Sequence, residues 1–493
     1  MAASTRQSNL FAAEDWKKVY ETFREADFQS YDYETIRKSM VEYIRNYYPE
    51  DFNDFIESSE YVALIDLISF LGQSLSFRSD LNARENFLET AERRDSILRL
   101  ARMLNYYPKR QQIARGLLKV ISVRTTESIT DSNQNSLRDQ DIEWADITNS
   151  DFLEQFTAII NSALVSTQKY GNPALKTTVG GVSIEEYQIK LQNNTIPIYD
   201  FQSTVGAQNL DFELVKGTYS GTDFLYEVAP IPGSTFNIQY RNDNRGFNSA
   251  DNGFFVYFKQ GSLQSADFDI TEKLPNRVVD IDINNIDNND VWLYKLNDQG
   301  REETRWEKVP AITGNNVIYN SLSNQNKDLF TVRSRANDQI SLVFGDDVFS
   351  NIPVGNYRVY FRTGAGTTYK ISPADMKNIT VSIPYISHAN QLENLTLTLS
   401  LQRTVANASA RESLRDVKIK AQQQYYTQDR MITGEDYQIL PYTKFNNVLK
   451  AKAINRTASG ISRYLDVRDT TGKYSSTNIV AEDGIIYRTE DLQ

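Results

Sequence analysis

Apolar residues recur with the period of an α-helix in the first 110 residues of the chain. One stripe has the spacing i, i+3, i+4, i+7 and i+11 and consists of Leu64, Leu67, Ile68, Leu71 and Leu75. A second stripe at helical spacing consists of Ile97, Leu100, Ala101 and Leu104. Pro108 follows it, and proline is poorly tolerated inside a helix. The pattern therefore predicts long helices, the last of which ends before Pro108.

Beyond Gly116 the spacing of apolar residues changes to that of β-strands. An apolar run at residues 254–258 follows Asp-Asn-Gly, and another run at residues 357–362 follows Pro-Val-Gly-Asn. Glycine, proline and asparagine are typical of turns, so each run is predicted to be a strand of a hairpin. Residues 125–150 contain few aliphatic side chains and much Ser, Asp, Asn and Gln. We expect an exposed loop or linker there.

Helical spacing returns after residue 402. One stripe has the spacing i, i+3, i+7 and i+11 and consists of Leu414, Val417, Ala421 and Tyr425. Thr433 and Asp436 have the spacing of a capping box, which predicts a short helix through Leu440. Strands are expected over residues 448–467 and 479–487.

Together these patterns predict a multidomain α+β chain with long N-terminal helices, central β-rich domains and a C-terminal α+β domain. A length of 493 residues predicts roughly three domains and not one. The predicted divisions are a helical region over residues 1–115, a β-rich domain with exposed loops over 116–230, a second β-rich domain over 231–400 and a C-terminal α+β region over 401–493.

Composition removes most enzyme classes. The chain has no cysteine and one histidine, His388, which excludes thiolate metal sites and disfavours a catalytic triad or a multi-histidine metal site. The formal net charge of −11 disfavours binding to nucleic acid and to anionic membranes. The polar N-terminus and the lack of an apolar run of about 18 residues predict neither an export signal nor a membrane helix.

Motifs for metals and cofactors are incomplete. Residues 280–284 resemble the start of a calcium loop, but residues 285 and 291 are Asn and Val where such a loop needs Gly and Glu. Residues 364–368 are rich in glycine and lack the spacing of a phosphate loop. The sequence therefore predicts no catalytic residue, no metal and no cofactor.

Charges in the helical region are segregated by sign. Between Arg45 and Arg78 the chain has six acidic residues and no basic one. The later stretch is basic and includes Arg93, Arg94, Arg99 and Arg102. Each stretch is either an ordinary solvated face or one half of an electrostatic pair that sets register and partner choice.

Three separated segments carry a further pattern. Residues 86–116 contain Asn-Phe-Leu-Glu-Thr-Ala, a helical stretch and a basic turn before the first strand. Residues 340–366 contain a Phe-Gly-Asp turn and a strand that ends in glycines, and residues 429–437 read Asp-Arg-Met-Ile-Thr-Gly-Glu-Asp-Tyr. In this order and spacing the segments resemble the baseplate J-like family of contractile-tailed phages. They are similar in particular to the wedge-core subunits of T-even-type members.

The second segment supplies the structural turn residues of this resemblance, Gly345, Asp346, Gly355, Gly364 and Gly366. Asp347 stands where the family usually has a second glycine. The resemblance therefore does not predict the conformation of the turn at Asp347.

The resemblance implies a structural, non-catalytic subunit of a baseplate wedge, located in the virion tail and assembled in the host cytoplasm. The implied partners are a second copy of the chain, with two copies per wedge, and other wedge proteins whose helices join its own in a bundle. The tail hub and sheath-initiating proteins are expected nearby. The C-terminal region is implied to join copies into a ring around the hub that rearranges on contraction. Nucleic acid and membranes are not expected as partners.

The candidate seam of the helical bundle consists of Leu64, Leu67, Ile68, Leu71, Leu75, Ile97, Leu100 and Leu104. These residues form either a seam between chains or a core within one chain. Two other functions remain as alternatives. A tail-associated polysaccharide-degrading enzyme would need two carboxylates in a cleft, and a receptor-binding adhesin would leave the N-terminal helices without a role.

Overall fold

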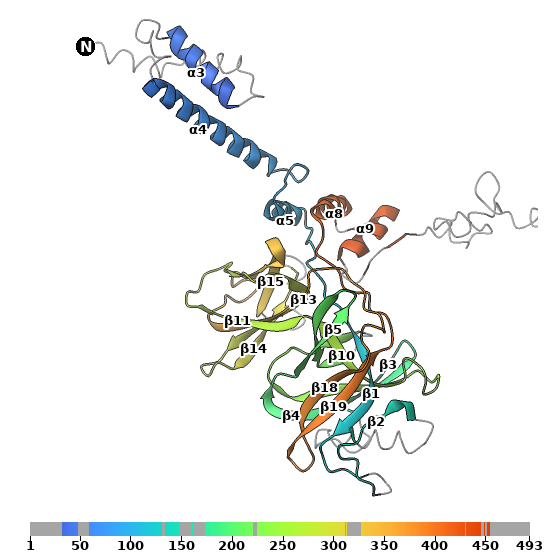
Figure 1. Ribbon diagram of the computed structural model, residues 1–493. Coiled ribbons are helices and arrows are strands. Elements are labelled where there is room, and N and C mark those ends of the chain that lie inside the picture. Colours follow the sequence, from blue (N-terminus) through green and yellow to red (C-terminus); the bar gives the residue numbers. More distant parts are fainter. Residues whose placement is uncertain are drawn as a thin grey trace, which may run out of the picture. The chain divides into compact units, whose positions relative to one another are not determined.

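The structure is a computed structural model that describes residues 32–47, 59–130, 134–146, 159–160, 173–219, 224–310, 312, 327–428, 430–444, 448 and 451–453 (Figure 1). The chain divides into two compact units, residues 1–104 and 105–493. Long N-terminal helices, two central sheets and C-terminal helices confirm the predicted α+β class. The strands predicted over 448–467 and 479–487 lie outside the described residues, apart from 448 and 451–453.

The first unit contains the helices α3 (Tyr33–Tyr47), α4 (Ser59–Arg84) and α5 (Arg94–Met103). Helix α3 packs on one side of α4. Arg37 Nε lies 2.7 Å from Asp66 Oδ1, and Gly72 leaves room for the side chain of Ile36. Hydrogen bonds from Tyr33 and Arg37 lower the pKa of Asp66. Because both side chains are partly open to solvent, this pair orients the two helices more than it stabilises them.

The turn between α4 and α5 is held by its own side chains. The Glu85 carboxylate accepts hydrogen bonds from the backbone N–H groups of Glu92 and Arg93, at 2.9 and 3.1 Å. The Thr90 hydroxyl donates to the carbonyl of Arg84 at 2.7 Å. These bonds stabilise the change of direction between the two helices.

The second unit contains a large sheet, in which ten described strands take part. Its main order is β18-β19-β1-β10-β9-β4-β3, while β2 pairs with β1, and β6 pairs with both β10 and β5. The strands are β1 (Arg115–Thr125), β2 (Ile142–Glu143), β3 (Leu175–Val179), β4 (Val182–Thr195), β5 (Ile198–Val205), β6 (Gln208–Val215), β9 (Gly233–Asn242), β10 (Gly253–Gln260), β18 (Ile379–Ile386) and β19 (Leu392–Leu401).

Seven further described strands form a small sheet in the order β11-β17-β13-β14-β15-β16-β12. They are β11 (Ser262–Ile270), β12 (Val278–Ile281), β13 (Ile286–Leu296), β14 (Glu302–Lys308), β15 (Leu329–Ser334), β16 (Ile340–Phe344) and β17 (Gly355–Thr363). The remaining elements are the hairpin of β7 (Gly217–Tyr219) and β8 (Leu225–Glu227), the helices α8 (Leu414–Thr427) and α9 (Gly434–Lys444), and the 3-10 turns η1 (Trp144–Asp146) and η2 (Ala336–Asp338).

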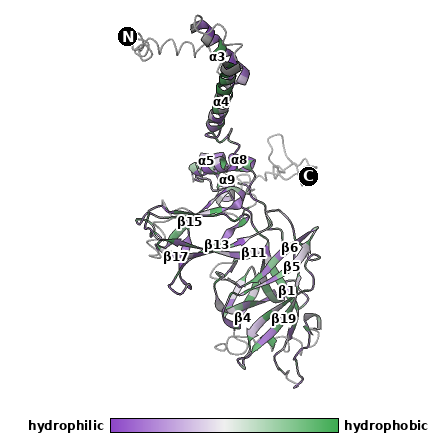
Figure 2. Ribbon diagram, turned by 60° about the vertical axis from the view of Figure 1, so that its left-hand side comes forward, coloured by the Kyte–Doolittle hydropathy of each residue, from purple (hydrophilic) through white to green (hydrophobic). Residues whose placement is uncertain are grey.

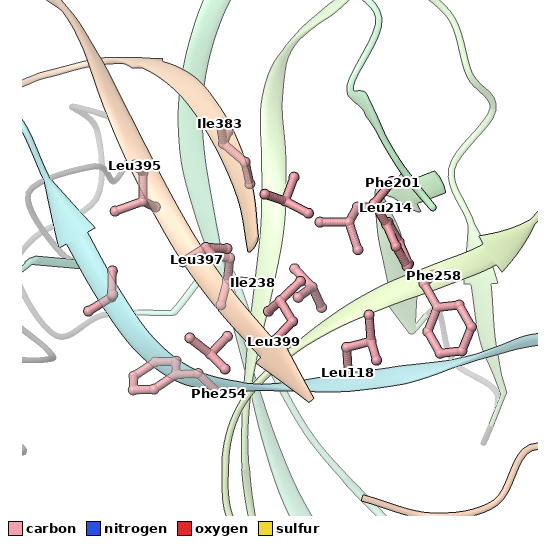
Figure 3. Close-up of a cluster of buried hydrophobic side chains, with 14 of the residues drawn as sticks. Leu118, Phe201, Leu214, Ile238, Phe254, Phe258, Ile383, Leu395, Leu397 and Leu399 are labelled. Carbon is pink, nitrogen blue, oxygen red and sulfur yellow. The ribbon is translucent and has the colours of Figure 1, made fainter. Parts of the chain in front are cut away.

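Each sheet has its own apolar core. In the large sheet, Leu118, Phe258 and Leu397 belong to one buried cluster, in which side chains from β1, β10, β18 and β19 converge (Figure 3). In the small sheet, the indole of Trp306 packs edge-on against Phe344 and Tyr357, with ring centroids 5.4 and 5.6 Å apart. The alternation of apolar and polar residues along the strands places these side chains on one face.

The sheets do not follow the division predicted at residue 230. Strands β9 and β10 come after that residue, yet β9 pairs with β4 and β10 pairs with β1 and β6. The large sheet therefore spans the predicted boundary. Long-range pairing of this kind leaves no mark on local composition.

Two local predictions need correction. The run at 357–362 is a strand, β17, but it pairs with β11 and β13 and does not form a hairpin with β16. The segment expected as an exposed linker contains β2 and η1, and buries Leu137, Ile142 and Trp144. The hairpin of β9 and β10 is confirmed, as are the helices at 414–427 and 434–444. Thr433 and Asp436 form the predicted capping box, with Thr433 N donating to Asp436 Oδ2 at 2.8 Å.

Two leucines of β19 test the position of the large core. Leu397 is fully buried and Leu392 is 59 % exposed. We expect Leu397→Ala to lower the free energy of unfolding by about 2–5 kcal/mol, because it leaves a cavity. The same change at Leu392 should alter it by less than about 0.5 kcal/mol. Urea unfolding of both variants measures the difference, and equal losses would contradict the assigned core.

Candidate functional site

Helix α4 exposes an unusually large apolar surface. Seven of its large apolar residues are 48–67 % exposed, namely Leu64, Leu67, Ile68, Phe70, Leu71, Leu75 and Phe77. At about 100° per residue they cover an arc of roughly 180° around the helix. We call these seven residues the α4 face. Figure 2 shows the many hydrophobic residues along this helix.

Among the described residues of its unit, only a narrow strip of α4 is covered. Ile65 and Ser69 are buried, and the Ser69 hydroxyl lies 3.7 Å from the sulfur of Met40 in α3. A single neighbouring helix covers a stripe about 100° wide. Helix α3 therefore leaves the α4 face open, and that face is wide enough for two more helices.

The α4 face is also almost free of charge. Between residues 61 and 77 the one charged residue is Asp66, which pairs with Arg37 of α3. Full burial of a leucine or phenylalanine side chain contributes about 1.5–3 kcal/mol. A contiguous apolar surface on a soluble chain is typical of a protein–protein interface.

The second predicted stripe has a different environment. Ile97 and Ala101 of α5 are fully buried, while Leu100 and Leu104 are half-buried. This burial favours the intrachain-core interpretation for Ile97. Of the two stripes, the one on α4 is open to a partner.

The described residues do not test the predicted pairing of the four candidate arginines with the acidic stretch. Asp66 pairs with Arg37, and Arg102 Nε donates to the carbonyl of Leu98 at 3.1 Å. Arg93 and Arg99 are exposed, whereas Arg94 is half-buried. The acidic residues at 50–57 lie outside the described residues. The electrostatic pairing stays a prediction.

Each of the two units contains a match to a known protein family. Residues 116–404, more than half of the chain, match the family described as a domain of unknown function, DUF8360. The chain belongs to the DUF8360 family. Residues 32–103 match the N-terminal domain of bacteriophage baseplate proteins. The chain is therefore a structural protein of the phage baseplate, and this second match contains α3, α4 and α5. No curated protein matches the chain.

The DUF8360 region contains the predicted structural turn at Gly345 and Asp346. A Cβ atom at Gly345 would lie 2.6 Å from Ser350 Cβ, so a larger residue does not fit there. The Asp346 carboxylate accepts hydrogen bonds from the backbone N–H groups of Val348 and Phe349, at 3.1 and 3.2 Å. Those bonds lower the pKa of Asp346. The turn is thus built by one glycine and one aspartate.

The other three turn glycines of the DUF8360 region flank β17. Gly355 is its first residue, and Gly364 and Gly366 follow its last residue. Asp347, which stands where baseplate J-like proteins usually have a second glycine, has the left-handed φ of 74° that glycine adopts most easily. Asp347 Oδ2 also pairs with Lys273 Nζ at 3.0 Å, in an exposed position. The turn is therefore formed without the glycine.

Sequence reasoning missed two groups of exposed residues. Phe70 and Phe77 belong to the α4 face, and their spacing of seven residues was the signal that could have found them. The C-terminal helices expose a second apolar group around α8 and α9, consisting of Ile419, Tyr425, Tyr426, Met431, Ile432 and Tyr437. No regular spacing unites this group, because it comes from two helices and the turn between them.

The described residues include neither a metal-binding group nor a membrane-spanning helix. They contain no group of three His, Cys, Asp or Glu side chains placed to hold a metal ion. Within the same ranges, each helix falls short of the apolar length that crossing a bilayer requires. Asp282 of the calcium-like segment instead pairs with Arg335 at 2.5 Å.

Asp347 offers a test of the turn. Alanine at this φ carries the full Cβ strain of about 1–2 kcal/mol, whereas glycine carries none. Asp347→Gly should therefore be more stable than Asp347→Ala by about 1 kcal/mol. Both variants lose the pair with Lys273, so that loss cancels in the comparison. Urea unfolding measures the difference, and an alanine variant as stable as the glycine variant would refute the turn geometry.

Proposed function

We propose that this baseplate protein is a non-catalytic wedge subunit whose α4 face is covered by helices of other chains. The observation that carries the proposal is the arc of roughly 180° on α4 that α3 leaves open. Two further helices would fill such an arc. A second copy of the chain and another wedge protein are the occupants that the resemblance to baseplate J-like wedge subunits implies.

The chemistry of the α4 face supports a permanent contact. Its residues are leucine, isoleucine and phenylalanine, and salt does not screen the burial of such side chains. Phe70 and Phe77 lie seven residues apart, as do Leu64 and Leu71, and Ile68 and Leu75. A seven-residue repeat is the spacing at which helices supercoil around each other. A bundle is therefore a better match to this face than a globular partner.

We further propose that the C-terminal region joins copies of the chain into a ring around the tail hub. The support is the exposed apolar group on α8 and α9, where Tyr426 is 79 % exposed. On contraction these contacts rearrange while the helical bundle stays closed. Packed interfaces with two discrete arrangements can carry such a switch.

Leu71→Asp tests the bundle. Leu71 is 57 % exposed, so the variant should fold as the wild type does. Its charge should prevent burial of the α4 face and weaken assembly with the other baseplate proteins of the same phage at least about tenfold. Co-purification of co-expressed wedge proteins, followed by size-exclusion chromatography, measures assembly. Circular dichroism checks the fold.

Gln73→Asp is the matched control, since Gln73 is exposed on the other side of α4 from Leu71. It adds the same charge outside the α4 face and should assemble normally. Normal assembly of Leu71→Asp would contradict the proposal. An unfolded Leu71→Asp chain would instead identify the stripe as an intrachain core, and hydrolysis of host glycans by the purified protein would support the enzyme alternative.

A further inference from the structure

The small sheet is one continuous insertion into the large sheet. Strands β11 to β17 occupy residues 262–363, whereas β10 before them and β18 after them belong to the large sheet. Among the described residues, the two apolar cores share no side chain. The second unit therefore contains two bodies with separate cores, the large-sheet body and the small-sheet body.

The chain crosses between these bodies at neighbouring points. Gln260 N donates to the carbonyl of Ala114 at 2.8 Å, and a Cβ atom at Gly261 would overlap the carbonyl of Thr363. A Cβ atom at Gly364 would lie 2.5 Å from a methyl carbon of Ile113. We call residues 113–114, 260–261 and 363–364 the waist. The glycines at two of these positions allow the crossing strands to lie close together. Hinges between domains consist of a few residues at the ends of elements, and these residues are often small.

A cluster of buried charges lies at the junction of the two bodies. It consists of three carboxylates and two cations, each no more than 7 % exposed, namely Glu213, Glu227, Asp290, Lys259 and Arg362. We call it the ion cluster. In the described structure it joins two bodies whose apolar cores are separate.

The ion cluster connects the bodies reciprocally. Arg362 of the small sheet donates to Glu213 of the large sheet, with Nη2 2.7 Å from Oε2. Lys259 of the large sheet donates to Asp290 of the small sheet at 2.8 Å. Glu227 of the β7–β8 hairpin accepts from both cations, at 2.8 Å from Lys259 and 2.5 Å from Arg362. Each body therefore supplies a cation to a carboxylate of the other.

Electrostatics keep the cluster charged despite its burial. Burial alone would lower the pKa of Lys259, but the charges of Asp290 and Glu227 outweigh it and raise the pKa. The same balance raises the pKa of Arg362. Buried ion pairs specify orientation more than they add net stability, because desolvation offsets much of their attraction. When the paired charges separate, water can solvate each of them.

We propose that the ion cluster is a latch, and that the small-sheet body turns about the waist when the latch opens while both sheets stay folded. This device is independent of the α4 face and adds a movable joint to the proposed wedge subunit. Opening would expose charges that water solvates, and each apolar core would remain closed.

The latch is connected to the chain segment that precedes the large sheet. Arg110 Nη2 donates to the carbonyl of Asp287 at 3.0 Å, and Ile113 N donates to Asp287 Oδ1 at 2.9 Å. Both bonds tie residues 110–113 to the small-sheet body. Gln112 and Ser409 exchange two backbone hydrogen bonds of 2.9 Å. A turn of the small-sheet body would therefore displace the paired segments that lead into β1 and into α8.

Arg362→Met and Arg358→Met make a matched pair of variants. Both residues lie on β17, but Arg358 bonds only within the small sheet, to Asp267 at 2.7 Å and Glu302 at 2.9 Å. The Leu263 amide is the reporter, because it donates across the junction to Glu213 at 2.6 Å. We expect its hydrogen exchange to be at least about tenfold faster in Arg362→Met and unchanged within about twofold in Arg358→Met.

Distance measurements distinguish opening from unfolding. Because the chain has no cysteine, spin labels can be placed at Leu392→Cys on the large sheet and Val278→Cys on the small sheet, both exposed positions. In Arg362→Met the distance distribution should broaden or shift, with exchange in β13 and β19 still protected. An unchanged distribution, or loss of protection in both sheets at once, would overturn the proposal.

The wild-type chain gives a test that needs no variant. Under mild urea, the Leu263 amide should exchange through an opening that precedes loss of protection in β13 and β19. Exchange of all three only by global unfolding would show that the two bodies form one inseparable fold. Neither result depends on assembly through the α4 face, so failure of the latch and failure of the wedge proposal are distinguishable.

Discussion

The structure depends on one mismatch between the apolar surface of α4 and the helices available to cover it. A helix that is apolar over most of its circumference is stable only when it is surrounded. Helix α3 covers the strip at Ile65 and Ser69, and seven large apolar residues remain exposed. Burial of such residues is the dominant favourable contribution to association in water. This exposed apolar surface is the basis of the proposed assembly with helices of other chains.

The second unit differs from the first, because the apolar cores of its sheets are buried within the unit itself. Its two sheets satisfy their apolar residues internally, each around its own core. Their junction contains charges in place of shared apolar packing. An apolar junction would resist separation in water, whereas a charged one selects an orientation and can be rehydrated. The proposed subunit thus combines an apolar surface for permanent assembly with a charged joint for movement.

Local features were predictable from the sequence because they depend on neighbouring residues. The apolar stripe from Leu64 to Leu75 was predicted from the helical period alone. The helix cap at Thr433 and Asp436 was predicted from the spacing of these two residues. The turn at Gly345 and Asp346 followed from a family resemblance. The helical period does not show whether other side chains bury an apolar stripe. Ile97 and Leu71 look alike in the sequence, yet one is buried and the other is exposed.

Features that join distant residues could not be predicted. Glu213 and Arg362 are 149 residues apart, and each reads as an ordinary polar position of a strand. The insertion of the small sheet was hidden because β19, which pairs with β18, also pairs with β1 across more than 250 residues of sequence. Pairing of this kind depends on the whole chain and leaves no local periodicity.

The structure of the assembled baseplate, determined by electron cryomicroscopy at side-chain resolution, tests the central claim most directly. The account predicts that helices of other chains cover Leu64 to Phe77 of α4 on the side that α3 leaves open. An assembled baseplate in which these residues still face solvent, or in which they contact only other parts of the same chain, would contradict it.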